Sequence, residues 1–472
     1  MICILVVHPI SGWTFLYRYN MRHFLNISRS ILFFLIFLSL GCFSVRAQND
    51  QQMYEIIQKV DQNRLASDIE TLANFGTRHT LSDTMSKSRG IGAARRWIKT
   101  EFENISAQCG GCLEVFYQRS LVKKGTNERI FQDVWVVNVV AIQKGTTHPE
   151  NYVIMSGDID SRISDPNNAV DEAPGANDNA SGMAGTLEAA RVLSHYTFKN
   201  SIVYVGLSGE EQGLFGGKGL ATYALDQNWN IIGVLNNDMI GNTQGIDGVK
   251  DNRSFRIFSE PTPVTETEQE RKARRFYGGE VDGVSRQLAR YVYKTTKQFM
   301  PEMNPMMIYR LDRFGRGGHH RPFNDAGFTG IRIMEAHENY DQQHQDLRIE
   351  NGVNYGDRLE HVDMAYVKKL TAVNAINLAQ LAEAPLAPTT VAISGMVAPS
   401  TRLSWSSVDG ATAYRVYWRD TTSPHWQYSR LVSDATELTL EGIVIDNFLF
   451  GVASVGPEGH ESPVKFPNKV IR

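Results

Sequence analysis

Residues Ser201 to Glu211 read S-I-V-Y-V-G-L-S-G-E-E, an apolar run that ends in two acidic side chains. A short apolar run rich in β-branched residues and followed by Ser-Gly is typical of a buried strand. In open α/β sheets the ligand site lies beyond the carboxyl ends of the strands. Glu210 and Glu211 are therefore candidates for a functional site at such an edge.

Four other segments also place acidic residues or histidine just after a predicted strand. They are Tyr152–Ser156 (Y-V-I-M-S) before Asp158 and Asp160, P-G-A-N-D-N-A-S-G with Asp178, I-I-G-V-L-N-N-D ending in Asp238, and I-R-I-M-E before His337 and His344. A single acidic residue after a strand is usually a helix cap or a solvated loop residue. Five such segments in one chain indicate a site for divalent cations.

Strands and helices alternate through the centre of the chain. The predicted strands are Asp133–Ile142, Tyr152–Ser156, Ser201–Leu207 and Ile231–Asn236, and the predicted helices are Met53–Phe75, Ile91–Phe102, Gly182–His195, Gly219–Leu225, Val284–Phe299 and Ala365–Glu383. This order predicts an α/β fold, a mostly parallel mixed sheet flanked by helices. Thr243–Arg274 is polar without a clear period, so we expect a loop there.

The sequence changes character after Glu383. Short aromatic and β-branched runs follow, separated by Gly, Pro, Ser and Asp, at Leu403–Trp405, Ala413–Trp418, Glu437–Leu440 and Phe448–Val455. This spacing predicts a small all-β sandwich. We therefore expect an α/β domain over residues 48–383, a linker over 384–388 and a β domain over 389–472, with few contacts across the linker.

The amino terminus has the layout of a secretory signal peptide covering residues 1–47. Three arginines between residues 18 and 29 precede the apolar run Ile31–Leu40, and small residues follow up to Ala47. The run is shorter than the ~20 apolar residues of a membrane-spanning helix. Met21 is an alternative start. We expect export to the periplasm or the extracellular space, or else a lipid anchor at Cys42.

Net charge and cysteine content argue against some classes of protein and of cysteine site. The net charge of −3 gives no basic field for nucleic acid. After cleavage at Ala47, only Cys109 and Cys112 remain, in C-G-G-C. In an exported protein this spacing indicates a short-range disulfide, because neither a second cysteine pair for zinc nor a thioredoxin-like context for redox chemistry is present.

Three motifs give the region from Leu65 to Leu381 a resemblance to the family-28 metallopeptidases, the co-catalytic zinc aminopeptidases and their relatives. The motifs are G-A-N-D-N-A-S-G, S-G-E-E-Q-G-L-F-G and N-N-D-M-I-G. The resemblance implies an aminopeptidase that hydrolyses N-terminal residues of peptides through metal-activated water, with two divalent ions, zinc first and manganese or cobalt as alternatives. The segments W-S-S-V-D-G-A-T-A-Y-R-V-Y-W and F-L-F-G-V-A-S-V-G-P-E-G-H-E-S resemble a fibronectin type III module.

The resemblance also assigns roles to residues. Asp178 would bridge the two ions, Glu211 and Asp238 would each bind one of them, and Glu210 would be the general base. A shared carboxylate offsets the repulsion between two dications, and a carboxylate that is not a ligand can take the proton of the water. His344 in Y-D-Q-Q-H-Q-D would be the last ligand, with His337 as the alternative.

This chain departs from the family where His-x-Asp is usual, because Asp158-Ile159-Asp160 stands there. Asp158 can still bind an ion, but Asp160 has no ring to orient, so its role as an outer-sphere or substrate residue is open. The more anionic ligand set favours manganese or cobalt as alternatives, and it leaves open a weakly filled first metal position. His320 in H-H-R-P-F resembles the histidine of the family's D-H-x-x-F, which implies either contact with the substrate carbonyl or packing under Phe323.

Other functions compete with the aminopeptidase hypothesis. Two are enzymes of the same architecture, a glutaminyl cyclase-like acyltransferase with one zinc ion and a carboxypeptidase. A third is a non-catalytic binding protein, whose β domain would contact a surface or a polysaccharide. The presence of Glu210 and Asp178 argues against that third hypothesis, because a binding protein has no need for a base or a bridging carboxylate.

Overall fold

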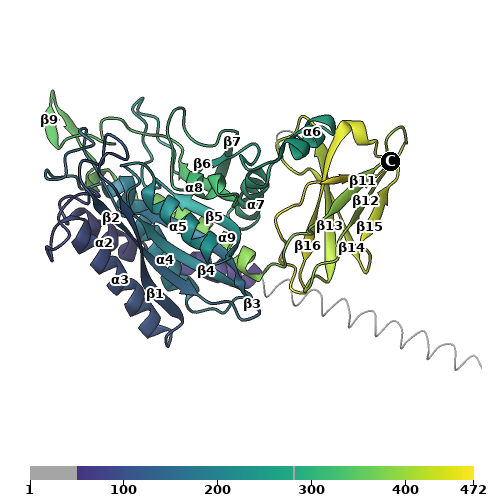
Figure 1. Ribbon diagram of the computed structural model, residues 1–472, viewed down its shortest axis with the longest axis horizontal. Coiled ribbons are helices and arrows are strands. Elements are labelled where there is room, and N and C mark those ends of the chain that lie inside the picture. The colour runs from purple at the N-terminus through teal and green to yellow at the C-terminus, as the bar shows by residue number, and fades with distance from the viewer. Residues whose placement is uncertain (1–49, 280–281, 472) are drawn as a thin grey trace, which may run out of the picture. The chain divides into compact units, whose positions relative to one another are not determined.

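The computed structural model describes residues 50–279 and 282–471 (Figure 1). The segment expected to be a signal peptide, with Met21 and Cys42, lies outside the described residues, so export stays a prediction. Within the described residues, no helix combines the length and the apolar character needed to cross a membrane.

An eight-stranded mixed sheet forms the centre of the larger domain, in the order β1-β2-β4-β3-β5-β8-β6-β7. The strands are β1 Leu113–Val122, β2 Val134–Gln143, β3 His148–Asp158, β4 Asn200–Leu207, β5 Asn230–Asn237, β6 Ser254–Ser259, β7 Asn304–Ile308 and β8 Gly330–Glu335. The four central strands β4, β3, β5 and β8 run parallel, whereas β1, β2 and β6 each pair antiparallel with a neighbour. The predicted fold class is confirmed.

Helices cover both faces of this sheet (Figure 1). The helices are α2 Gln62–Ala73, α3 Gly90–Gln108, α4 Gly182–Leu193, α5 Phe215–Asp226, α6 Glu268–Phe276, α7 Val284–Phe299, α8 His320–Asp325 and α9 Met364–Glu383. In strand β4, Ile202 and Tyr204 belong to the buried cluster that contains residues of α2, α3, α4, α7 and α9, while Val203 and Val205 belong to the cluster that contains residues of α5 and α8. Burial of both faces explains why these strands are continuous apolar runs.

Two predicted segments differ from the structure. The helix expected over Met53–Phe75 is broken at Val60, because Asp61 caps the start of α2 by accepting from the Asn63 N–H. The loop expected over Thr243–Arg274 is wrong, since this segment contains β6 and most of α6. Helix α6 has no buried residues, so it carries no apolar period, and a capping box of Thr267 and Glu270 begins it instead.

Two small sheets form the carboxyl-terminal β domain. Their strands are β11 Val391–Ser394, β12 Thr401–Trp405, β13 Ala413–Asp420, β14 Tyr428–Ser433, β15 Glu437–Leu440, β16 Phe448–Val455 and β17 Lys469–Val470. One sheet has the order β15-β12-β11-β17 and the other β14-β13-β16. Both contribute to one buried cluster around Leu403, Val416 and Phe450, which agrees with the small all-β domain that the spacing of the short runs predicted.

Buried ion pairs join the β domain to the larger domain, so the expectation of few contacts across the linker is wrong. Arg419 Nη2 lies 2.8 and 2.7 Å from the two carboxylate oxygens of Asp282, and Arg290 Nη1 lies 2.7 Å from one of them. All three side chains are at most 3% exposed. Lys294 also pairs with Glu461, at 2.6 Å. These partners are too far apart in sequence for composition to predict them.

Replacing Asp282 by alanine should therefore destabilise the whole chain. It leaves two buried arginines without their carboxylate, and breaking a buried ion pair typically costs about 3–5 kcal/mol. Glu437→Ala is the matched control, because the Arg402–Glu437 pair is more than half exposed and exposed pairs contribute about 0–1 kcal/mol. Urea unfolding of both variants measures the difference. Equal unfolding free energies would show that the junction adds no stability.

Candidate metal centre

The central parallel strands bring the candidate acidic residues to one edge of the sheet. Strand β3 ends at Asp158, strand β4 leads to Glu210 and Glu211, and strand β5 leads to Asp238. Asp178 lies at the start of α4, in the π-helical turn Ala176–Ser181. Because these strands are parallel neighbours, their carboxyl ends meet, as the sequence analysis expected.

Asp178, Glu211 and His344 form one compact group of potential metal ligands. Nε2 of His344 lies 3.0 Å from an Asp178 oxygen and 2.9 Å from a Glu211 oxygen. One ligand atom from each of the three residues lies within 4.8 Å of the other two. Two carboxylates and one imidazole are a ligand set that suits zinc and leaves a further position open for water or substrate. These residues fit the metal ion that the sequence implies.

His344, and not His337, joins this group. The backbone of His344 has φ = 56°, in the left-handed region that non-glycine residues rarely adopt. Such a conformation persists only where surrounding contacts hold it, and it is commonest at functional sites. His337 instead accepts a hydrogen bond from Asn242 through its carbonyl, and its ring lies beside Gly245.

The backbone around Asp178 is held by a carboxylate that was not among the predicted site residues. The N–H groups of Asn177 and Asp178 donate to Asp357, at 2.8 and 2.6 Å. Gln343 donates to the Asp178 carboxylate at 3.0 Å. Burial raises the pKa of Asp357 to about 6, although the two N–H donors oppose this shift. Asp178 is thus positioned from both its backbone and its side chain.

Arg162 contacts two of the three potential ligands. Its Nε donates to Glu211 at 2.7 Å, and its Nη2 lies 2.6 Å from Nδ1 of His344. Burial alone would raise the pKa of Glu211, but His344 and Arg162 lower it to about 2. Glu211 is therefore held as a carboxylate, the form that binds a metal ion. Because Arg162 lies against Nδ1 of His344, Nε2, which faces Asp178 and Glu211, is the ring nitrogen placed to bind an ion.

Glu210 lies among four other carboxylates of this edge. Burial raises its pKa well above the usual value, and the carboxylates of Glu211, Asp238, Asp158 and Asp178 raise it further. A group that binds a proton readily is suited to general base and acid chemistry. Glu210 lies outside the compact group formed by Asp178, Glu211 and His344, which is consistent with a residue that transfers protons.

Asp160 positions the turn that carries these glutamates. Its two carboxylate oxygens accept from the N–H groups of Glu210 and Glu211, at 3.2 and 3.1 Å, and from the hydroxyl of Thr80 at 3.2 Å. This gives Asp160 a structural role that does not depend on a histidine ring. The sequence left its role open because the backbone donors belong to a different strand.

Asp160→Asn should misplace Glu210 without removing it. One carboxylate oxygen becomes an NH₂ group, which cannot accept from a backbone N–H, and a hydrogen bond to a charged group contributes about 1.5–3 kcal/mol. We expect kcat to fall by about 10-fold or more, because loss of about 1.4 kcal/mol of transition-state stabilisation slows a reaction about 10-fold. Thr80→Val is the control, because it removes only the hydroxyl bond. Unchanged kcat in Asp160→Asn, measured on a small substrate, would contradict this role.

Asp158 and Asp238, the other two candidate ligands, pair with histidine, amide and guanidinium side chains. Asp158 Oδ1 lies 2.5 Å from Nδ1 of His319, and its Oδ2 accepts from Asn179 at 2.7 Å. Asp238 Oδ2 lies 2.9 Å from Nη2 of Arg332. Among residues 50–279 and 282–471, no compact group of three potential ligand atoms includes Asp158 or Asp238.

His320 has a structural partner in the neighbouring loop. It is fully buried at the start of α8, and its Nε2 lies 2.7 Å from the carbonyl of Leu311. The residue of this segment that reaches the metal centre is His319. His319 was not among the predicted site residues, although it stands where the family's D-H-x-x-F motif has aspartate, and that replacement was the signal in the sequence.

Comparison with known proteins decides the family. Residues 138–355 match the model for peptidase family M28. A probable zinc metalloprotease of Pyrenophora tritici-repentis is 37% identical over 423 residues, covering 89% of this chain and 98% of that protein. A probable zinc metalloprotease of Leptosphaeria maculans is 38% identical, covering 91% of this chain and 99% of that protein.

The chain belongs to peptidase family M28. Its fold is similar to that of the LapA aminopeptidase of Legionella pneumophila, with a TM-score of 0.51 and 17% identity over 71% of this chain and 75% of that one. Asp178, Glu211 and His344 all lie within the matched residues 138–355. We refer to residues 50–383 as the M28 domain from here on.

A second group with ligand-like spacing lies outside the family match. Glu383, Glu458 and His460 also offer three potential ligand atoms within 4.8 Å. Lys199 already neutralises this group, because its ammonium lies 3.3 Å from Glu383 and 3.9 Å from Glu458. An ammonium among the carboxylates is incompatible with a bound dication, so this group is an ion-pair cluster of the M28 domain and the β domain.

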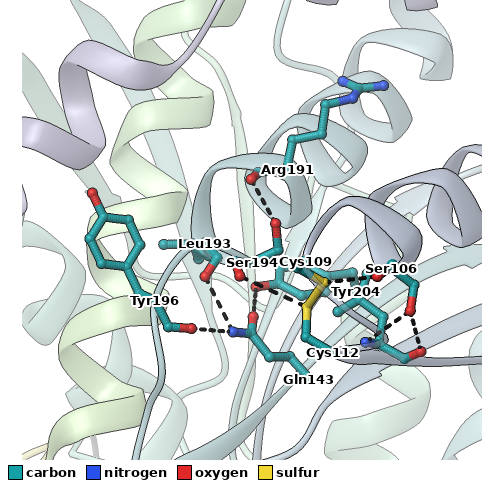
Figure 2. Close-up of a disulfide and its surroundings, with 10 residues drawn as sticks. Ser106, Cys109, Cys112, Gln143, Arg191, Leu193, Ser194, Tyr196 and Tyr204 are labelled. Atoms are coloured by element: carbon teal, nitrogen blue, oxygen red, sulfur yellow. Dashed lines mark hydrogen bonds between the residues drawn. A yellow bond between two sulfur atoms is a disulfide. The ribbon is translucent and has the colours of Figure 1, made fainter.

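Cys109 and Cys112 form a disulfide in the structure (Figure 2). It closes the turn between the end of α3 and the start of β1. The hydroxyl of Ser106 bridges the same turn by donating to the Leu113 carbonyl and accepting from its N–H, at 2.8 and 3.2 Å. This disulfide belongs to the scaffold of the M28 domain and lies outside the residues that match the family model.

Proposed function

We propose that this M28 peptidase is a zinc-dependent aminopeptidase that removes N-terminal residues from peptides. The observation that carries the proposal is the compact Asp178–Glu211–His344 group beside Glu210, at the carboxyl edge of the parallel strands. The names of the two fungal relatives support zinc as the ion. Retention of Glu210 and Asp178 argues against a binding protein without catalytic activity.

The side chains divide the chemical work between them. When bound, zinc supplies a Lewis acid that polarises the substrate carbonyl and increases the acidity of water. Glu210 accepts the proton of the attacking water and returns it to the departing amine. Asp160 holds the N–H groups of Glu210 and Glu211, and Arg162 keeps Glu211 ionised. The carboxyl ends of the parallel strands hold these side chains in position.

The charges around the centre support an aminopeptidase over a carboxypeptidase. A carboxypeptidase needs a cation for the terminal carboxylate of its substrate. Four of the arginines around this centre are paired with a carboxylate of the M28 domain: Arg162 with Glu211, Arg332 with Asp238 and Asp312, and Arg313 and Arg316 with Glu338. The many carboxylates at this edge instead provide a negative potential that suits a substrate ammonium.

One observation supports a second candidate, glutaminyl cyclase-like acyl transfer. The described residues contain one compact group of ligands at the centre rather than two, and that activity was expected to use one zinc ion. In such a reaction the substrate's own N-terminal amine would attack the side-chain amide of glutamine. The two candidates share the zinc group and Glu210 but differ in the bond that breaks.

Export and the nature of the β domain remain proposals as well. The layout of residues 1–47 supports a cleaved signal peptide, and a disulfide in the M28 domain is compatible with an oxidising compartment. The sequence of the β domain supports a fibronectin type III-like module. Its role would be contact with a surface or a polysaccharide, which is independent of the chemistry at the zinc group.

A matched substrate panel separates the candidate activities. The full chain is assayed with zinc on a set of aminoacyl anilides, on their N-acetylated counterparts, on an N-terminal glutaminyl peptide and on N-blocked peptides with a free carboxyl terminus. We expect hydrolysis of the free anilides and none of the acetylated ones. Release of ammonia from the glutaminyl peptide without peptide cleavage would favour the cyclase. Cleavage of the N-blocked peptides alone would favour the carboxypeptidase.

A further inference from the structure

We propose that the M28 domain holds a single ion at its centre, and that Arg332 takes the place of the second cation. The inference rests on the proposed metal-dependent function and specifies its metal content. It concerns the position between Asp158, Asp178 and Asp238, where the family resemblance placed the other ion.

Arg332 lies in the middle of the sheet, in β8, with its side chain fully buried. Its Nε donates to the Asp238 carbonyl at 2.5 Å, and its Nη2 lies 2.9 Å from the Asp238 carboxylate. Its Nη1 donates to both oxygens of Asp312, at 3.1 and 3.0 Å, and to the Gly317 carbonyl at 2.8 Å. The guanidinium is thus held by two carboxylates and two carbonyls.

Asp158, the other ligand of that position, also has partners on both carboxylate oxygens. His319 approaches Oδ1 at 2.5 Å, and the Asn179 amide donates to Oδ2 at 2.7 Å. His319 and Asp158 are both buried. In the part of the chain that the structure describes, the oxygens of Asp158, Asp178 and Asp238 do not converge as those of the Asp178–Glu211–His344 group do.

These contacts leave the position unsuited to a dication. A second ion there would lie beside a buried guanidinium, and like charges repel strongly where water is excluded. Moving the guanidinium away would leave Asp312 buried without its Arg332 partner, which is costly. In a two-ion centre the second ion neutralises the extra carboxylates. Here Arg332 supplies that neutralisation from the protein itself, while His319 and Asn179 occupy the two oxygens of Asp158.

The same geometry gives Arg332 a positioning role. It fixes Asp238 at the strand end beside Glu210, in the place where a ligand–metal bond would otherwise fix it. Arginine suits this role better than lysine, because its planar guanidinium bonds several oxygens in fixed directions. The chain therefore combines the acidic motifs of a two-ion centre with side-chain contacts that leave room for one ion.

Zinc content measured by elemental analysis tests the proposal. The purified full chain is dialysed against increasing free zinc, and Asp178→Ala is treated identically to subtract ions bound elsewhere. We expect a difference of one zinc ion per chain at saturation, whereas a difference of two would overturn the inference while leaving the proposed function intact. No difference would instead overturn the proposed function.

A second measurement isolates Arg332. Arg332→Met should free Asp238 and raise the difference above one ion per chain, whereas Asp312→Asn, which weakens the same ion pair on its other side, should leave it at one. Binding of cobalt, followed by its visible absorption, reports the same count without an activity assay. If Arg332→Met folds and still binds a single ion, Arg332 does not exclude the second one. If Arg332→Met does not fold, the number of zinc ions bound per wild-type chain tests the proposal on its own.

Discussion

Glu210→Gln is expected to lower kcat by about 10²–10⁴-fold, the range typical for loss of a general base. Glutamine keeps the size and most polar contacts of glutamate but cannot accept the proton of the attacking water. Glu210 is outside the group that would hold the ion. Zinc content and thermal stability should therefore stay close to those of the wild type. Steady-state kinetics on an aminoacyl anilide, together with elemental analysis, measure both properties.

Glu211→Gln is the matched control for this prediction. It alters the adjacent residue of the same turn, but it weakens a ligand and also the contact with Arg162. We expect this variant to lose zinc, with activity falling in proportion. If Glu210→Gln loses zinc and Glu211→Gln retains it, the roles assigned to the two glutamates are exchanged.

Asp178→Ala is expected to remove the ion and the activity together. The family resemblance implies that Asp178 binds both ions of a two-ion centre, and the structure places it in the compact group with Glu211 and His344, so either arrangement depends on it. Zinc-dependent stabilisation should also disappear. At a free ion concentration 100 times the Kd, a bound ligand stabilises a protein by about 2.7 kcal/mol.

Glu383→Ala is the comparison that makes this result specific. Glu383 belongs to the other acidic group, which Lys199 neutralises. We expect this variant to keep its zinc, its activity and its zinc-dependent rise in melting temperature. Retention of zinc by Asp178→Ala, with activity above background, would show that the ion binds elsewhere in the chain.

The sequence predicted the central fold because buried parallel strands have a simple signature. Ser201–Leu207 and Ile231–Asn236 are continuous apolar runs, and the structure contains β4 and β5 over nearly the same residues. Parallel neighbours end at one edge, so the acidic residues that follow them had to meet. Short stretches of sequence were therefore enough to predict both the strands and the sheet edge at which the acidic residues meet.

Partners from distant segments could not be predicted in this way. His319 and Arg332 reach Asp158 and Asp238 from segments more than 90 residues away, and no local pattern pairs them. One signal was available. Arg332 interrupts the apolar strand I-R-I-M-E, and a charged residue in a buried strand needs a buried counterion.

Exposed elements and domain contacts escaped prediction for a related reason. Helix α6 buries nothing, so its sequence has no apolar period. The linker after Glu383 has the composition of an independent spacer, yet Arg419 reaches Asp282 across the junction. The composition of the linker describes the linker alone. It does not show which residues of the M28 domain and the β domain contact each other.

Zinc-dependent hydrolysis of a free aminoacyl anilide tests the central claim most directly. The full chain is stripped of metal with a chelator, and zinc is then titrated back while hydrolysis of the anilide and of its N-acetylated form is followed. We predict no activity in the stripped protein, recovery that saturates as the Asp178–Glu211–His344 group fills, and no hydrolysis of the acetylated form. Full activity without zinc, or equal hydrolysis of both substrates, would contradict a metallo-aminopeptidase.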